Sequence, residues 1–184
     1  MALPLPVAFF AGTSGVWRID RVDPVVGDGL SMARRIAVVE GRDAFRQRDC
    51  TWVLRGVTSN ARYSTRDELD SLEGKQEPLL RAQATRAALI PVRKSEAWWS
   101  LAQDERRLIF EEDSQHIAMG LEYLPAVARR LHHSRELGEE FDFLTWFEYA
   151  PEHSEKFEEL VRRLRETKEW RYVDREVDIR LSRD

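Results

Sequence analysis

The segment FDFLTWFEY, residues 141–149, places Phe141, Phe143, Thr145, Phe147 and Tyr149 at every second position. Because successive side chains of a strand point to opposite faces, these five residues are predicted to share one face of a strand. Such a face needs a core or a cavity wall to cover it. The preceding RRLHHSREL is also typical of a strand, and GEE (138–140) is predicted to join the two strands as a hairpin.

The rest of the chain alternates between strand-forming and helix-forming segments. Strands are predicted for VAFFAG (7–12), VWRIDRV (16–22), RIAVVEG (35–41), TWVLRGVTSNARY (51–63), AALIPVRK (87–94) and VDIRL (177–181). A helix capped by Ser64 or Thr65 is predicted for 64–75, and one helix or two short ones for 95–113. The apolar stripe of Phe157, Leu160, Val161 and Leu164 predicts an amphipathic helix that packs on a sheet.

This order of elements predicts an α+β fold in which helices cover one face of a largely antiparallel sheet. A chain of 184 residues is most simply a single domain. We expect two halves within it, a shortened ferredoxin-like half over about residues 1–65 and a fuller half over about residues 66–184.

Composition narrows the range of partners. The formal net charge is −4, from 29 basic and 33 acidic side chains, which argues against a general binder of nucleic acid or anionic membranes. Cys50 is the lone cysteine, so neither an internal disulfide nor a thiolate metal site is indicated. The N-terminus lacks a basic leader, and no run approaches the ~20 apolar residues of a membrane helix. We therefore expect a cytoplasmic protein.

The segment from Asp113 to Tyr149 contains three of the four histidines, and His116 is the most interesting of them. Asp113 and Ser114 are predicted helix caps, which places His116 in the first turn of a helix. On one straight helix, His116 and Arg129 would lie about 20 Å apart along the axis. Pro125 cannot continue a helix, so we predict that the chain bends there and brings both residues around one cavity.

Several kinds of catalytic site are not indicated. His132 and His133 would point to opposite faces of a strand, which makes them a poor zinc-binding pair. The sequence has no G-x-S-x-G turn for a hydrolase nucleophile and no phosphate-binding loop. A haem needs only one protein ligand and an aromatic or aliphatic cavity, and the residues permit this. A histidine in a surface position or a hydrogen-bonded core position is the alternative for His116.

The segments LRGVTSNARY, RAALIPVRKSEAWW, DERRLIFEEDSQHIAMGLEYLPAVARRLHHSRELGEEFDFLTWFEYAPEH and LRETKEWRYVDREVDIRL together resemble the chlorite dismutases, specifically their short, dimeric branch. The resemblance spans about residues 50–182, and the stretch from Asp104 to His153 is its most specific part. It implies ferredoxin-like repeats that form a dimeric α+β barrel, a shortened N-terminal half, and a homodimer.

The resemblance also implies roles for individual residues. His116, in SQHIA, matches the proximal ligand of a haem b iron, one per chain. Glu169, in TKEW, matches the carboxylate that accepts a hydrogen bond from the other ring nitrogen of that histidine. Arg129, in LPAVARRL, matches the distal arginine, whose guanidinium would hold a small oxyanion above the iron. Arg130 should point away as a surface charge.

Further residues are placed in the haem pocket by the same resemblance. Gln76, in GKQEP, matches the glutamine that orients the distal arginine. Phe147 and Trp99 match aromatic positions on the proximal side. Asn60 and Tyr63, in SNARY, match residues that meet the haem propionates. The remaining histidines match no ligand position.

The implied reaction converts chlorite to chloride and dioxygen through a ferryl species and hypochlorite, with chlorite and similar small anions as ligands. Two other functions are kept as alternatives. One is another haem enzyme of the same fold, either a peroxidase-like enzyme or a coproheme decarboxylase, whose family lacks the distal arginine and has longer chains. The other is a haem-free dimeric α+β barrel that acts as a binding protein. The physiological role, detoxification or another, is left open by the sequence.

Overall fold

The computed structural model describes residues 4–58 and 64–184. Within these residues the chain forms eight strands, five α-helices and several shorter helical turns. The strands are β1 Pro6–Gly12, β2 Trp17–Val26, β3 Arg35–Glu40, β4 Trp52–Thr58, β5 Arg86–Lys94, β6 Val127–His133, β7 Phe143–Tyr149 and β8 Val173–Ser182. The α-helices are α1 Arg66–Lys75, α2 Glu96–Ser100, α3 Gln103–Arg107, α4 His116–Glu122 and α5 Ser154–Arg165.

The strands close into a barrel in the order β1-β3-β2-β8-β5-β7-β6-β4, and every neighbouring pair is antiparallel. The four N-terminal strands are contiguous in this order, as are the four C-terminal strands. Pairing of β2 with β8 and of β4 with β6 joins the two sets. The pairings of β2 with β3 and of β4 with β6 are short, with two residue pairs each. The predicted α+β fold with an antiparallel sheet is confirmed.

Two large apolar cores, beside a small cluster of Ala8, Phe10 and Ala44, follow from the alternation of side chains along the strands. The barrel interior is filled from most of the strands, and from β8 it receives Val177, Ile179 and Leu181. The opposite face of β5 and β7 packs against the helices and forms the second core. Strand β5 is consequently buried on both faces, which explains its nearly continuous apolar sequence.

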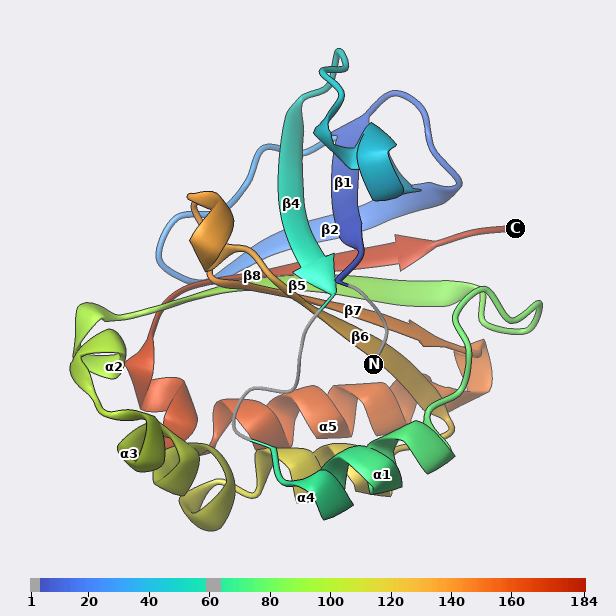
Figure 1. Cartoon of the computed structure of the whole chain (residues 1–184). Coiled ribbons are helices and arrows are strands. Elements are labelled where there is room, and N and C mark those ends of the chain that lie inside the picture. The colour runs from blue at the N-terminus through green and yellow to red at the C-terminus, as the bar shows by residue number, and fades with distance from the viewer. Residues whose placement is uncertain (1–3, 59–63) are drawn as a thin grey trace.

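The helices form a layer on one side of the barrel, where α5 runs across the sheet and α1 and α4 lie beside it (Figure 1). The predicted stripe is confirmed, because Phe157, Leu160, Val161 and Leu164 are all buried. None of the helices in the described part of the chain has both the length and the apolar character that crossing a bilayer requires.

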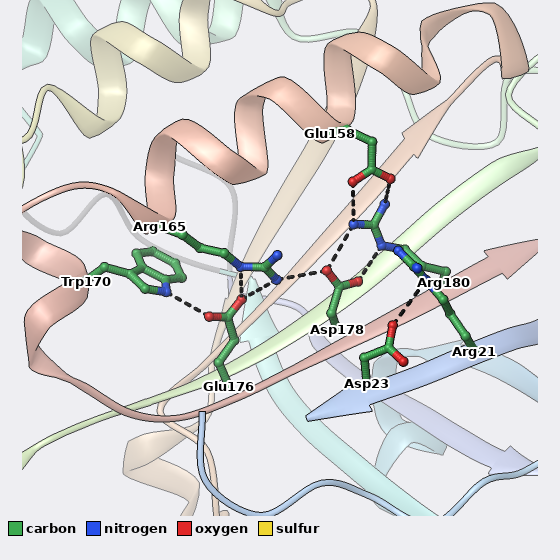
Figure 2. Close-up of polar contacts among 8 residues, drawn as sticks. All are labelled: Arg21, Asp23, Glu158, Arg165, Trp170, Glu176, Asp178 and Arg180. Carbon is green, nitrogen blue, oxygen red and sulfur yellow. Dashed lines mark hydrogen bonds and ion pairs between the residues drawn. The ribbon is translucent and has the colours of Figure 1, made fainter. Parts of the chain in front are cut away.

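Ion pairs also hold α5 against β8 (Figure 2). Arg180 binds Glu158 of the helix at 2.6 Å and pairs with Asp178 of its own strand. Arg165, at the end of α5, reaches back to Asp178 at 2.8 Å and to Glu176 at 2.6 Å. Between Glu176 and Leu181, the residues on the helix-facing side of β8 are thus charged, while those on its other side are Val177, Ile179 and Leu181.

Most of the predicted elements are confirmed. Thr65 caps α1 in a capping box, in which its side chain accepts the Glu68 N–H and the Glu68 carboxylate accepts the Thr65 N–H. Residues 95–113 form two short helices, followed by a π-helical turn over Leu108–Asp113. That turn lies directly before α4, the helix that begins at His116.

The predicted caps of α4 are wrong. Its N-cap is Gln115, which adopts a left-handed conformation with φ 52° and ψ 37°. The carboxylate of Glu111 takes over the capping role, because it accepts the N–H groups of Ile117 at 2.6 Å and Ala118 at 3.1 Å. The Ser114 hydroxyl instead accepts the N–H of Glu169 at 3.1 Å. A tertiary contact has therefore replaced the local cap.

The hairpin between β6 and β7 also differs from expectation. Its connection runs over residues 134–142 and contains a 3₁₀ turn at Arg135–Leu137, so GEE is only part of it. Because β7 begins at Phe143, the two-residue alternation does not extend back to Phe141. Phe141 belongs to the barrel interior, whereas Phe147 and Tyr149 face the helices.

The junction between α5 and β7 provides a test of this packing. The Phe157 side chain is 0% exposed, and its ring lies 4.5 Å from that of Tyr149 and 5.1 Å from that of Phe147, centroid to centroid. We expect Phe157→Ala to lower the free energy of unfolding by about 3–5 kcal/mol, because it leaves a cavity between two layers. Urea unfolding measures this. Phe45→Ala, at a phenylalanine that is 55% exposed, should change it by less than about 1 kcal/mol, and an equal loss in both variants would contradict this picture.

Candidate active site

A cavity lies between the sheet and the helical layer, and each of four adjacent strands contributes to its wall. Its lining residues from the sheet are Glu176 on β8, Ile90 and Val92 on β5, Thr145 and Phe147 on β7, and Arg129 on β6. The helical side contributes His116, Val161, Leu164 and Trp170. The cavity is therefore mostly apolar, with a few polar groups at defined places, as in many cofactor sites.

His116 and Arg129 line this cavity from different layers. His116 begins α4, the chain turns over residues 123–126, and Arg129 follows on β6. The turn reverses the chain, so the two side chains face one space despite their separation in sequence. The prediction that a bend at Pro125 brings them together is confirmed.

The His116 imidazole is hydrogen-bonded to a buried carboxylate. Its Nδ1 lies 2.7 Å from Oε2 of Glu169, and the other oxygen of Glu169 accepts a 2.7 Å hydrogen bond from Nζ of Lys94. Burial by itself raises the pKa of the Glu169 carboxyl, but the Lys94 charge and the bonds from Lys94 and His116 outweigh it and lower that pKa to about 2. The ionised carboxylate favours a proton on Nδ1, which leaves Nε2 as the basic nitrogen.

Neighbouring residues fix the orientation of the imidazole. The Phe110 ring stacks on that of His116 at a centroid distance of 4.4 Å and an interplanar angle of 22°. Glu111 holds the first N–H groups of α4, and Ser114 holds the backbone of Glu169. The π-helical turn thus restrains the histidine ring, and Ser114, the residue after the turn, restrains its carboxylate partner.

Arg129 brings a positive charge into the apolar wall. Burial lowers the pKa of its guanidinium, while the charge of Glu111 acts in the opposite direction, and an arginine stays protonated under such conditions. Among residues 4–58 and 64–184, no carboxylate lies within ion-pair distance of this guanidinium. The group also packs against Gly120 of α4, where an added Cβ would overlap it. A small anion in the cavity would therefore meet a guanidinium that forms no ion pair with a described carboxylate.

The other predicted residues differ in whether they line the cavity. Phe147 lines the cavity. Gln76 donates a 2.6 Å hydrogen bond to the backbone carbonyl of Arg129, so it contacts the arginine through its main chain. Arg130 points away and pairs with Glu40 at 2.8 Å, as predicted for a surface charge. Asn60 and Tyr63 lie outside the described residues.

Trp99 does not line the cavity. Its indole N–H donates to Asp142 at 3.2 Å, and the Arg135 guanidinium lies 4.1 Å from the centre of its ring. Its neighbour Trp98 is the buried one, with the Lys94 ammonium 4.8 Å from its ring centroid. Consecutive helical residues point about 100° apart, so only one of the two can face inward. A contact between Trp99 and haem stays a prediction.

Three residues of the site were not found from the sequence. Lys94 is 5% exposed although it is a lysine at the end of a strand, and Trp170 and Glu176 both line the cavity. A signal existed for Lys94, because the two-residue period that places Ile90 and Val92 on the cavity face extends to position 94. Glu176 shares one face of β8 with the charged residues Asp178 and Arg180, so its burial could not be read from the strand pattern; its partners Arg165 and Trp170 come from the end of α5 and the turn that follows.

Comparisons with known proteins agree with this geometry. The model of the chlorite dismutase family matches residues 37–184, and the chain therefore belongs to the chlorite dismutase family. The dimeric chlorite dismutase from Nitrobacter winogradskyi has a crystal structure that is 55% identical in sequence, with a TM-score of 0.90 over 97% of this chain and 99% of that chain. The resemblance to this family, and to the short form of its fold, is confirmed.

More distant relatives share the fold. A chlorite dismutase variant from Candidatus Nitrospira defluvii is 22% identical, with a TM-score of 0.70 over 98% of this chain and 91% of that chain. The chlorite dismutase of Ideonella dechloratans is 37% identical over 102 residues, which are 54% of this chain and 34% of that protein. The chain thus matches about a third of the length of that relative.

Acid unfolding tests the ionised state of Glu169. Its pKa in the folded chain, about 2, lies below the ordinary value of 4.5. Ionisation of Glu169 therefore stabilises the fold above pH 4.5, and this stabilisation is lost as the pH falls towards 2. We expect the free energy of unfolding of the wild type to approach that of Glu169→Gln by up to about 1.4 kcal/mol per pH unit over this range. Urea titrations at a series of pH values give the difference.

Glu155→Gln is the matched control, because Glu155 lies on the exposed side of α5 and does not line the cavity. Its difference from the wild type should stay small throughout the same titration. A difference between wild type and Glu169→Gln that did not change with pH would show that Glu169 is not held ionised by Lys94 and His116.

Proposed function

We propose that this chain is a haem-dependent chlorite dismutase, which converts chlorite to chloride and dioxygen. The observation that supports it most strongly is the placement of His116, with its carboxylate partner, and of Arg129 on two walls of one apolar cavity. Because the chain belongs to the chlorite dismutase family, this arrangement supports a reaction of haem with chlorite.

The residues of the cavity fit a haem b, one per chain. His116 would hold the haem iron through Nε2, because its Nδ1 is hydrogen-bonded to Glu169. Apolar side chains, among them Val92, Phe147 and Leu164, supply the surface that a porphyrin ring requires. When bound, ferric haem supplies the redox-active iron on which oxygen-atom chemistry with chlorite depends.

Glu169 and Lys94 determine which ring nitrogen of His116 is free to bind a metal. The ionised Glu169 holds the proton on Nδ1 of His116, which makes Nε2 a stronger electron donor to a metal. Lys94 keeps that carboxylate ionised in a buried position. The pair acts through His116 and has no contact with the substrate in this proposal.

Arg129 binds the substrate anion. Its guanidinium has a permanent charge and a planar set of donors that match the oxygen atoms of chlorite. Because the cavity wall around it is apolar, the attraction for a small anion is stronger than it would be in water. Arg129 also keeps chlorine-containing anions from diffusing away before dioxygen is formed. Gln76 restrains the arginine backbone.

We further propose that the protein is a cytoplasmic homodimer. The dimeric state of the Nitrobacter winogradskyi protein supports the dimer, since that protein matches over nearly the whole chain. Detoxification of chlorite or of a related small oxidant is the corresponding role. Contacts of Asn60, Tyr63 and Trp99 with the haem remain part of this proposal.

Replacement of the histidine tests the haem site. We expect His116→Ala to lower haem affinity by at least about tenfold, because the side chain that would hold the iron is lost. Titration of haem into the purified protein, followed at the Soret band, gives the affinity, and iron analysis gives the stoichiometry. His153→Ala, at a histidine that does not line the cavity, should bind haem as the wild type does. Wild-type haem content in His116→Ala would overturn the assignment.

Replacement of the arginine tests the reaction. Haem-loaded wild type should release dioxygen on addition of chlorite, as recorded with an oxygen electrode. We expect Arg129→Ala to keep its haem, to give a lower total yield of dioxygen, and to bleach its haem sooner, because anions are no longer retained. The neighbouring variant Arg130→Ala removes an equal charge on the other face of β6 and should retain the wild-type yield. An unchanged yield in Arg129→Ala would contradict the role given to Arg129.

A further inference from the structure

Asp142 is a buried carboxylate that the proposed reaction does not use. It lies directly before β7 and is 4% exposed. Its main chain is anchored on both sides, because its N–H donates to the carbonyl of Val92 at 2.9 Å and its carbonyl accepts the N–H of Ser134 at 2.9 Å. A buried carboxylate is costly unless donors occupy its oxygen atoms. The donors that occupy them indicate what Asp142 does.

The two oxygen atoms of Asp142 have different kinds of partner. Oδ2 accepts the main-chain N–H of Lys94 at 2.7 Å and the indole N–H of Trp99 at 3.2 Å. Oδ1 accepts a hydrogen bond of 3.1 Å from the guanidinium of Arg135, whose side chain is 47% exposed. Lys94 is the last residue of β5 and Trp99 belongs to α2. The inner oxygen, Oδ2, therefore joins the end of this strand to the helix.

The main chain leaves the regular sheet at Lys94. Within the described strands, the pairing of β5 with β7 ends at Val92 and Phe143, and the pairing of β5 with β8 shifts register between Arg93 and Lys94. A main-chain N–H released from a ladder in this way needs another acceptor. The Asp142 carboxylate supplies it, so a side chain determines where β5 ends and from where the Lys94 side chain departs.

The Lys94 ammonium lies in an enclosure built by several segments. Its Nζ is 2.7 Å from Oε1 of Glu169, 4.8 Å from the ring centroid of Trp98 and 5.2 Å from that of Trp170. A lysine side chain is flexible, so it keeps one position only if its backbone and the surrounding rings are both fixed. Asp142 fixes the backbone of Lys94 directly, and it fixes the helix that carries Trp98 through the indole of the next residue.

We propose that Asp142 is a positioning residue for the histidine side of the site. It holds the Lys94 ammonium against Glu169, and it thereby fixes the hydrogen bond at Nδ1 of His116. Three contacts of 2.7 Å each connect Asp142 to Lys94, Lys94 to Glu169 and Glu169 to His116. Asp142 does not line the cavity as the described residues define it, so it acts through Lys94.

The inference rests on the proposed function where it concerns iron. The hydrogen bond at Nδ1 of His116 determines how strongly Nε2 would donate electrons to a metal. A residue that fixes the partners of this bond therefore influences the metal without contact with it. The arrangement of the histidine ring itself can be measured without haem, so the two parts of the inference are tested separately.

Nitrogen NMR of the histidine rings tests the arrangement in the full chain purified without haem. In the wild type we expect Nδ1 of His116 to carry the proton. Lys94→Met removes the ammonium and should change the shifts of both ring nitrogens. Asp142→Ala should change them in the same direction and by at least about half as much, because the ammonium loses its position. Asp142→Asn keeps an acceptor oxygen for the Lys94 N–H and should stay close to the wild type.

A double substitution separates this role from simple anchoring of the connection between β6 and β7. If Asp142 acts through Lys94, Asp142→Ala adds no further change in the Lys94→Met background, whereas a merely structural loss would add the same change in both backgrounds. Arg135→Ala is the matched control, since it removes the partner of the outer oxygen and leaves both inner bonds. Should Asp142→Ala not fold, Asp142→Glu displaces the carboxylate by one methylene group and should show the same dependence on Lys94.

The same variants loaded with haem give a second readout. Resonance Raman spectra of the ferrous protein record the iron–histidine stretching band, which responds to the hydrogen bond at Nδ1. We expect Asp142→Ala and Lys94→Met to move this band in one direction and Arg135→Ala to leave it in place. Wild-type ring shifts in folded Asp142→Ala, or equal changes with and without Lys94, would refute the role of Asp142 and leave the proposed function standing. A wild type with the expected ring shifts that binds no haem would refute the proposed function alone.

Discussion

The alternation of side chains along β8 is the constraint on which the rest of the molecule depends. The strand pairs with β2 on one side and with β5 on the other, so it joins the N-terminal strands to the C-terminal ones. Val177, Ile179 and Leu181 fill the barrel, while the other face presents charges to α5. A shift of one residue would exchange the two sets and leave charges inside the barrel. The register of β8 with β2 and β5 therefore fixes the barrel core, the contacts with α5 and one side of the cavity wall.

The candidate site is built on the same two-layer principle. Lys94 comes from the sheet, His116 from α4 and Glu169 from the turn after α5, and the carboxylate holds the other two at 2.7 Å each. Buried charges of this kind are tolerated only when each is paired, so the three segments specify one another's positions. Arg129 is the exception, because this half-buried cation has no ion-pair partner among the described residues, and such a cation is what an anion-binding site needs.

Where the sequence-based predictions were wrong, a tertiary contact had replaced a local one. Ser114 is a good cap by residue type, yet its hydroxyl binds the backbone of Glu169, and Glu111 caps the helix from the preceding turn. Trp98 and Trp99 are equivalent by composition, and only the orientation of α2 decides that Trp98 is buried. The division into halves at about residue 65 remains a prediction, although the barrel order keeps β1–β4 and β5–β8 contiguous.

The sequence by itself determined the strands, the amphipathic α5, the turn at Pro125 and, through its resemblance to a family, the roles expected of His116, Arg129 and Glu169. These properties are local, because they depend on residue type, on periods of two and 3.6 residues, and on short motifs. Only the tertiary structure decided that Lys94 and Glu176 are buried and that Arg129 lines the same cavity as His116. A charged residue looks exposed in sequence, and its burial depends on a partner that folding brings from elsewhere in the chain.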